Sequence, residues 1–203
     1  HTPLLRPLLE EKWNSELTES KPADPKKHEQ AKELLKIDAD LPAIILWPRG
    51  QRIDLSAFQD VFRKEGSWPH PAKLGKPAED VLKALEVFAE EMAELSRAAR
   101  ERPLCRFDVK YEAHFAASMP HLMVLRNLTR CFTLRAVARL EAGKLEAAFA
   151  DVEMGLFLTE GLAAEPLALS QLVRISNLEM ILQAIWEGFA AEKWTAGQLV
   201  TLE

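Results

Sequence analysis

The fold is decided by residues 120–166, PHLMVLRNLTRCFTLRAVARLEAGKLEAAFADVEMGLFLTEGLAAEP. This stretch predicts two antiparallel helices, over 120–141 and about 144–163. A proline opens the first helix, where a backbone N–H would have no intrahelical partner, and Pro166 follows the second. Gly143 separates them, because glycine adopts the left-handed conformation that ends a helix without a Cβ clash. The stretch therefore indicates an αα-hairpin within an all-α fold.

The turn of this hairpin, GKLEAA at 143–148, resembles the turn of a tetratricopeptide repeat (TPR). The likeness ends with the turn. Val152 and Gly155 replace the expected aromatic and small residues, and Glu160 replaces the closing proline. No second copy recurs at a spacing of about 34 residues. A generic antiparallel helical array is therefore the simpler interpretation, and a right-handed TPR-like stack is the alternative.

Composition and charge are those of an ordinary globular chain. The 203 residues suffice for a sizeable core, in one large or two small domains. The net charge of −5 argues against nucleic acid and against an anionic membrane surface as main partners, because both favour a basic surplus. No run of about 18 uncharged apolar residues is present, so we expect no membrane span within this chain.

Proline content divides the chain near residue 75. Eight of the twelve prolines fall in residues 1–74, which predict an irregular region with short helices. Within it, 25–37 predicts a helix, and 43–47 predicts a short strand or an extended segment laid over helices. Residues 75–203 predict a helical array.

Further helices flank the hairpin. Asp54 or Ser56 caps a helix that ends near Lys64. A longer one over 77–102 carries a heptad-like seam of Val81, Leu85, Phe88, Met92, Leu95 and Ala99. The helix from Pro120 is apolar on most of its circumference, which predicts a position in the middle of the array.

A fourth helix is predicted over 166–191. Its apolar seam, of the kind that packs against neighbouring helices, consists of Leu172, Ile175, Leu178, Leu182, Ile185 and Phe189. Thr195 and Gln198 then have the spacing of a capping box, which predicts a fifth helix. We expect the array to continue beyond residue 203.

No catalytic, metal or cofactor motif is recognisable. The sequence lacks H-E-x-x-H, an E-x-x-H pair, a G-x-S-x-G elbow and a glycine-rich phosphate loop. Cys131 lies in an apolar helix, where a thiol is usually a small buried hydrophobe, and Cys105 lies in a connector. We therefore predict no catalytic residue, no metal ligand and no cofactor.

Polar residues near the central helix are the candidates for binding a ligand or a partner. These candidates are Arg106, Tyr111, His114, His121, Arg126 and Arg174. The two histidines lie beside a helix N-terminus, where capping or packing is the commoner role. The arginines of the central helix either form an anion site or pair with acidic neighbours such as Asp151 and Glu153, and the near balance of charge favours pairing.

Several short motifs occur together along 77–203. They are the RPLCRF segment at 102–107, Pro-His-Leu at 120–122, LRAVARLEAG at 134–143, LVRI at 172–175 and IWEG at 185–188. With these motifs the chain resembles an uncharacterised bacterial family of helical, TPR-like proteins with no assigned activity. The resemblance implies a longer protein, often with a hydrophobic leader, and hence an envelope-associated location.

Three hypotheses for function follow. The leading one is a non-enzymatic helical scaffold or protein-interaction module, with a protein or peptide partner, within a larger protein. The second is a small-molecule or lipid-binding helical domain, hydrolytic in one version, with a pocket near Tyr111, His114, His121 and Arg126. The third is homo-oligomerisation through the seam of residues 81–99, and the sequence does not define the oligomeric state.

Overall fold

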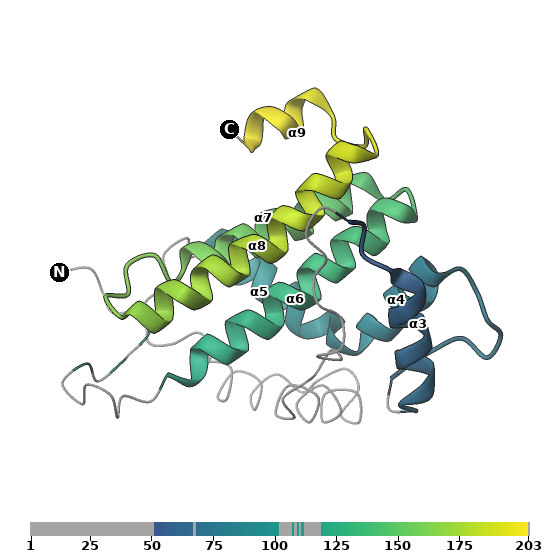
Figure 1. Ribbon diagram of the computed structural model, residues 1–203, viewed down its shortest axis with the longest axis horizontal. Helices are drawn as coiled ribbons and strands as arrows, with labels where there is room; N and C mark the ends of the chain where they lie inside the picture. The colour runs from purple at the N-terminus through teal and green to yellow at the C-terminus, as the bar shows by residue number, and fades with distance from the viewer. Residues whose placement is uncertain are drawn as a thin grey trace.

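The computed structural model describes residues 51–66, 68–101, 107, 109, 111 and 119–202. The helices are α3 (Leu55–Lys64), α4 (Pro77–Leu85), the 3₁₀ helix η1 (Glu86–Phe88), α5 (Ala89–Glu101), α6 (Pro120–Glu141), α7 (Leu145–Glu160), α8 (Ala168–Ala190) and α9 (Ala196–Thr201) (Figure 1). The described part of the chain contains no strand, and the predicted all-α class is confirmed. The segments predicted over 25–37 and 43–47 lie outside the described residues.

The hairpin predicted around Gly143 is present. Gly143 has a φ of +73°, in the left-handed region. The N–H of Lys144 donates to the carbonyl of Arg139 at 2.8 Å, the six-to-one bond of a Schellman motif. Helix α7 ends at Glu160, earlier than predicted, because the following N–H groups bond three residues back, beginning with Leu162 to Thr159.

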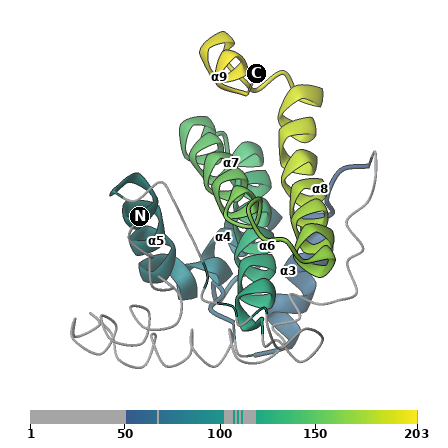
Figure 2. The ribbon, with the colours of Figure 1, turned by 90° about the vertical axis from the view of Figure 1, so that its left-hand side faces the viewer.

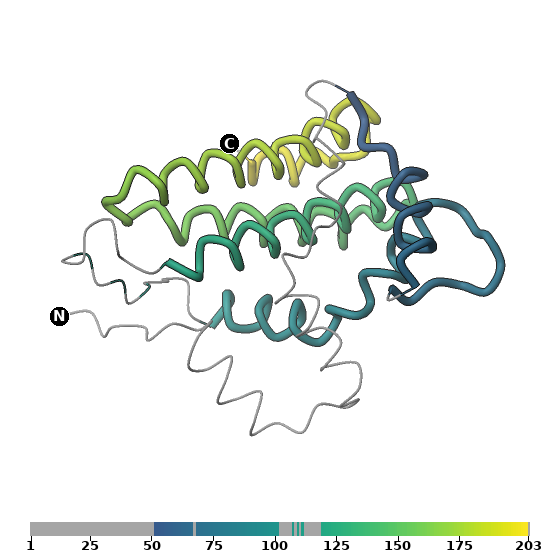
Figure 3. The backbone as a smooth tube through the Cα atoms, turned by 60° about the horizontal axis from the view of Figure 1, so that its bottom comes forward, coloured from purple at the N-terminus to yellow at the C-terminus, as the bar shows by residue number. Residues whose placement is uncertain are grey.

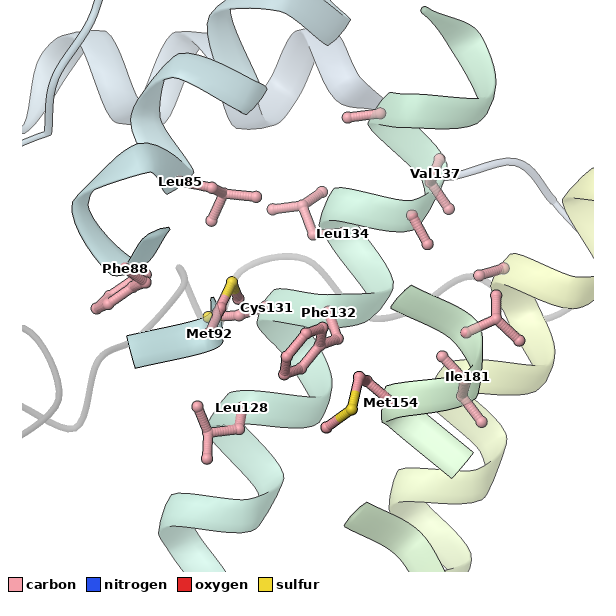
Figure 4. Packing of buried hydrophobic residues seen from close by; sticks show 14 of the residues in the cluster. Leu85, Phe88, Met92, Leu128, Cys131, Phe132, Leu134, Val137, Met154 and Ile181 are labelled. Carbon is pink, nitrogen blue, oxygen red and sulfur yellow. The ribbon is translucent and has the colours of Figure 1, made fainter. Parts of the chain in front are cut away.

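Helix α6 occupies the middle of the array, as its apolar circumference predicted. It contacts α4, α7 and α8, and Figures 2 and 3 show α5 and α8 on opposite sides of it. In Figure 4, Leu134 lies opposite Leu85 of α4. Phe132 lies nearer to Met154 of α7. Cys131 is a buried hydrophobe, as expected, and burial raises the pKa of its thiol to about 12.

The single helix predicted over 77–102 is broken. α4 ends at Leu85, the 3₁₀ helix follows, and α5 begins at Ala89. The tighter 3₁₀ turn redirects the chain, so that α4 packs on α3 and α6 while α5 contacts α7. Most of the apolar seam is nevertheless buried, including Val81 and Met92. This seam belongs to the core and offers no face to a second copy.

Helix α3 begins at Leu55 and is capped by Asp54, one of its two predicted caps. The Asp54 side chain accepts hydrogen bonds from the N–H groups of Ser56 and Ala57 at 2.9 and 3.2 Å. Gln59 of α3 donates to Asp80 of α4 at 2.7 Å, which ties the two helices together. The predicted division near residue 75 falls between these packed helices, and whether it separates domains stays a prediction.

Helices α7 and α8 approach closely at Gly155, which has no side chain to hold them apart. A Cβ atom at Gly155 would lie 2.4 Å from Cδ1 of Ile181. Further along α8, a Cβ atom at Gly188 would lie 2.1 Å from the ring of Trp194. The indole N–H of Trp194 also donates to the carbonyl of Ile185 at 2.9 Å, so the chain after α8 folds back on its end.

Helix α9 has the predicted capping box. The N–H of Gln198 donates to the hydroxyl of Thr195 at 3.3 Å, and the N–H of Thr195 donates to the side chain of Gln198 at 2.9 Å. Both bonds of the motif are therefore formed.

Candidate functional site

A row of large apolar side chains is exposed along the outer face of α8. The α8 stripe consists of Leu172, Ile175, Leu182, Trp186 and Phe189, whose exposed fractions run from 40% to 63%. Its members are spaced by three, four or seven residues, so they share about a third of the helix circumference. Figures 2 and 3 show α8 at the edge of the array, with α6 and α7 on its inner side.

This stripe overturns the orientation expected for α8. The outward members of the predicted seam are Leu172, Ile175, Leu182 and Phe189. The inner face instead contains small residues such as Ser170, Ala184 and Gly188, which allow close approach to the neighbouring helices. Met180, Ile181 and Ile185 are also buried on this face, while five other large apolar side chains of α8 remain outside.

Asn177 shows that apolarity alone does not set this orientation. Its side chain is 0% exposed, on the inner face of α8. Neither its amide nitrogen nor its amide oxygen has a hydrogen-bond partner within the part of the chain that the structure describes. A buried polar group without a partner costs about 1–3 kcal/mol. The fold therefore tolerates a buried amide while five large apolar side chains remain exposed.

The predicted residue His121 lies in a buried polar cluster at the start of α6. Its Nε2 is 2.7 Å from Oε1 of Glu165, and its ring stacks on Phe107 with centroids 4.2 Å apart. The hydroxyl of Ser170 donates to the other oxygen of Glu165. Sequence reasoning missed Glu165 and Ser170, which are 44 and 49 residues from His121 in the chain.

This cluster joins the α7–α8 connection to the N-terminus of α6. Burial disfavours the charged form of Glu165, but hydrogen bonds from His121 and Ser170 outweigh it and lower its pKa. Ser170 bonds to the carboxylate and not to the imidazole, so the three groups lack the nucleophile-to-base contact of a hydrolytic triad. A buried ionised carboxylate held by two donors is a structural cross-link.

The other predicted residues have separate surroundings. Arg174 forms an ion pair with Glu160 at 2.6 Å. Arg126 is exposed on α6, and Tyr111 is partly buried against the core. Arg106 and His114 lie outside the described residues, so the predicted pocket that includes His114 stays a prediction.

Two arginines of α6 pair with an acidic residue of α7, as charge balance suggested. Arg135 donates to Asp151 from two nitrogens, the shorter bond being 2.6 Å, and Arg139 donates to the same carboxylate at 2.7 Å. Burial raises the pKa of Asp151 despite both guanidinium groups. These three groups hold the hairpin together and do not form an open anion site.

A cavity of about 330 Å³ lies where α6 and α8 end, at the opposite end of α6 from His121. Glu187 of α8 lines it and is 7% exposed, and burial raises the pKa of its carboxyl group. The N–H of Ile53 donates to Glu187 at 2.7 Å across 134 positions of sequence. Sequence reasoning named Glu187 only as part of the IWEG motif and assigned it no role, and it is one of two carboxylates in a largely apolar helix, with Glu179.

Among the described residues, no helix is long and apolar enough to cross a membrane. The same part of the chain holds no group of three or more His, Cys, Asp or Glu side chains able to bind a metal ion. Comparison with family models, with curated proteins and with solved structures finds no match to this chain. The resemblance to a TPR-like bacterial family stays a prediction.

Proposed function

We propose that the chain is a non-enzymatic helical scaffold whose α8 stripe binds an amphipathic helix of a partner protein. The observation that carries this proposal is the row of five large apolar side chains on the outer face of α8. Soluble proteins rarely expose contiguous apolar patches larger than a few hundred Å², and larger patches mark interaction sites. A TPR-like stack of hairpins is the form of scaffold that the GKLEAA turn supports.

The spacing of the stripe favours a helix as its occupant. From Leu172 to Phe189 the stripe extends about 26 Å at 1.5 Å per residue. Its residues occupy the a and d positions of successive heptads, with Glu179 at the central a position. A second helix with the same spacing would place its own apolar residues between these side chains.

Charge favours a different protein over a second copy of this chain. In a parallel or an antiparallel pair of α8 helices, the two copies of Glu179 would lie within about one helical turn of each other. A symmetric pair would therefore contain two charged side chains near the centre of its apolar seam, and a polar residue at an a position lowers the stability of such a pair. A partner helix with Lys or Arg at its central position would instead meet Glu179 with the opposite charge. The partner is therefore an amphipathic helix with an apolar heptad face and a central basic residue.

Selection from a displayed library of helical peptides tests this proposal. The peptides would carry apolar residues at a and d positions and varied residues elsewhere, and the intact chain would be the target. Affinity of the selected peptides would be measured by fluorescence anisotropy. We expect binders with a central basic residue, and the double variant Ile175→Gln/Phe189→Gln should weaken them more than about tenfold.

Met123→Gln is the matched control, because Met123 is an exposed apolar residue on α6, outside the stripe. The affinity of the selected peptides for this variant should stay within about twofold of their affinity for the original chain. Failure to select any binder, or equal binding by the double variant, would contradict the proposal. Self-association that the double variant abolishes would make a second copy the occupant and contradict the choice of partner.

A further inference from the structure

The cavity at the ends of α6 and α8 has a buried carboxylate inside and charged side chains at its rim. The proposed helix-binding function involves neither. Its buried charge is the carboxylate of Glu187, which is fixed by the Ile53 N–H at 2.7 Å and by the Gln183 side chain at 3.0 Å. Both bonds are accepted by Oε1. Among the described residues, no hydrogen bond to Oε2 is present, so this oxygen is left for another donor.

The rim of the cavity carries two cations and one carboxylate. Arg52 and Lys193 line it and are exposed, together with the carboxylate of Glu141. Arg52 attracts the charge on Glu187, and Glu141 repels it. Lys193 is held at the rim by the turn that ends α8, where Glu192 has a φ of +52° and the Lys193 N–H donates to the carbonyl of Gly188 at 2.9 Å.

The wall between these charges is apolar. Ile53, Val137 and Leu140 are buried side chains that line the cavity. Helices α6 and α8 both end here, and the negative ends of their dipoles favour a positive group. The volume of about 330 Å³ is enough for a small organic molecule.

From this arrangement we propose that the cavity binds a small amino-acid zwitterion with an apolar side chain. The ammonium group donates to Oε2 of Glu187, and the carboxylate lies between Arg52 and Lys193. The side chain contacts Val137 and Leu140. The two rim cations exceed the single rim carboxylate, Glu141, by one positive charge, which the carboxylate of the ligand balances, while its ammonium group balances Glu187.

Titration of the isotope-labelled full chain with three matched probes tests this site. The probes are leucine, leucinamide without the carboxylate, and N-acetylleucine without the ammonium group. The backbone amide of Ile53 and the side-chain amide of Gln183 are the reporters, because both donate to Glu187. Leucine should shift both signals with a Kd below about 1 mM, and each of the other probes should bind at least about tenfold more weakly.

Two variants test whether leucine binds in this cavity. Glu187→Gln removes the charge but keeps an acceptor for Ile53, and Lys193→Gln alters an exposed side chain outside the core. Each should weaken leucine binding about tenfold, while the control Lys64→Gln on α3 should leave it unchanged. Absence of any shift with leucine, equal binding of the three probes, or leucine binding unaffected by Lys193→Gln would overturn the proposal.

Discussion

Helices α6 and α8 are similar in length and in the spread of their apolar residues, but they lie in different environments. They contain 22 and 23 residues, and both carry apolar side chains on most sides. Helix α6 is enclosed by α4, α7 and α8, whereas α8 turns its largest apolar side chains outward. A helix with apolar residues on most of its circumference can therefore occupy either of two positions in a helical array. In α6 it marks the centre of the array, and in α8 it marks a helix with a second contact face.

The largest expected effect lies at the centre of the array. Phe132 of α6 is fully buried, so Phe132→Ala should lower the free energy of unfolding by about 3–5 kcal/mol. Leu182→Ala removes a similarly apolar side chain from the α8 stripe and should cost less than about 1 kcal/mol. Urea denaturation of both variants measures the difference. Equal losses would mean that the stripe is part of the core.

The inner face of α8 should be sensitive to added volume. Gly188→Ala places a Cβ atom against the ring of Trp194 and should destabilise the chain by about 1–3 kcal/mol. Gly197→Ala in α9 is the control, because nothing lies within 4 Å of a Cβ atom there. It should be neutral or stabilising by up to about 1 kcal/mol, since alanine favours helix. Thermal unfolding of both variants gives the comparison, and tolerance of Gly188→Ala would contradict the close packing.

Asn177 should be replaceable by an apolar residue of similar size. Asn177→Leu removes a buried amide without partners and should raise the free energy of unfolding by about 1–2 kcal/mol. Chemical denaturation measures this gain. A loss of stability would show that the amide makes a contact essential to the inner face.

Acid should weaken the cross-link at the start of α8. The pKa of Glu165 lies below its ordinary value of 4.5, so the folded chain holds the charged form more strongly than the unfolded chain. Its contribution to stability is present above the ordinary pKa and is lost as pH falls through the lowered one. Glu165→Gln should flatten the fall in stability below about pH 5. Unfolding midpoints measured across this range check it, and an unchanged acid dependence would contradict the assignment.

The features that sequence predicted correctly depend on nearby residues. Gly143 ends α6, Asp54 caps α3, and Thr195 with Gln198 caps α9, each through bonds within a few positions of the chain. Short-range patterns suffice for such elements, because the geometry of one turn decides them.

The orientation of α8 could not be obtained in this way. Its apolar residues allow either face to be buried, and Gly155 and Gly188 select one face through contacts with Ile181 and Trp194. The cavity is still harder to predict, because Glu187 is positioned by an N–H 134 residues away. The orientation of α8 and the cavity both depend on packing between distant segments, and the local spacing of apolar residues does not predict such packing.

Two tryptophans provide the most direct test of the outer face of α8. Trp186 belongs to the exposed stripe, whereas Trp194 is buried and bonded to the carbonyl of Ile185. Indole N–H signals of both would be followed by NMR while a selected helical peptide is added. We expect the Trp186 signal to shift and the Trp194 signal to stay in place. A bound peptide that shifts Trp194 alone, or neither signal, would contradict it.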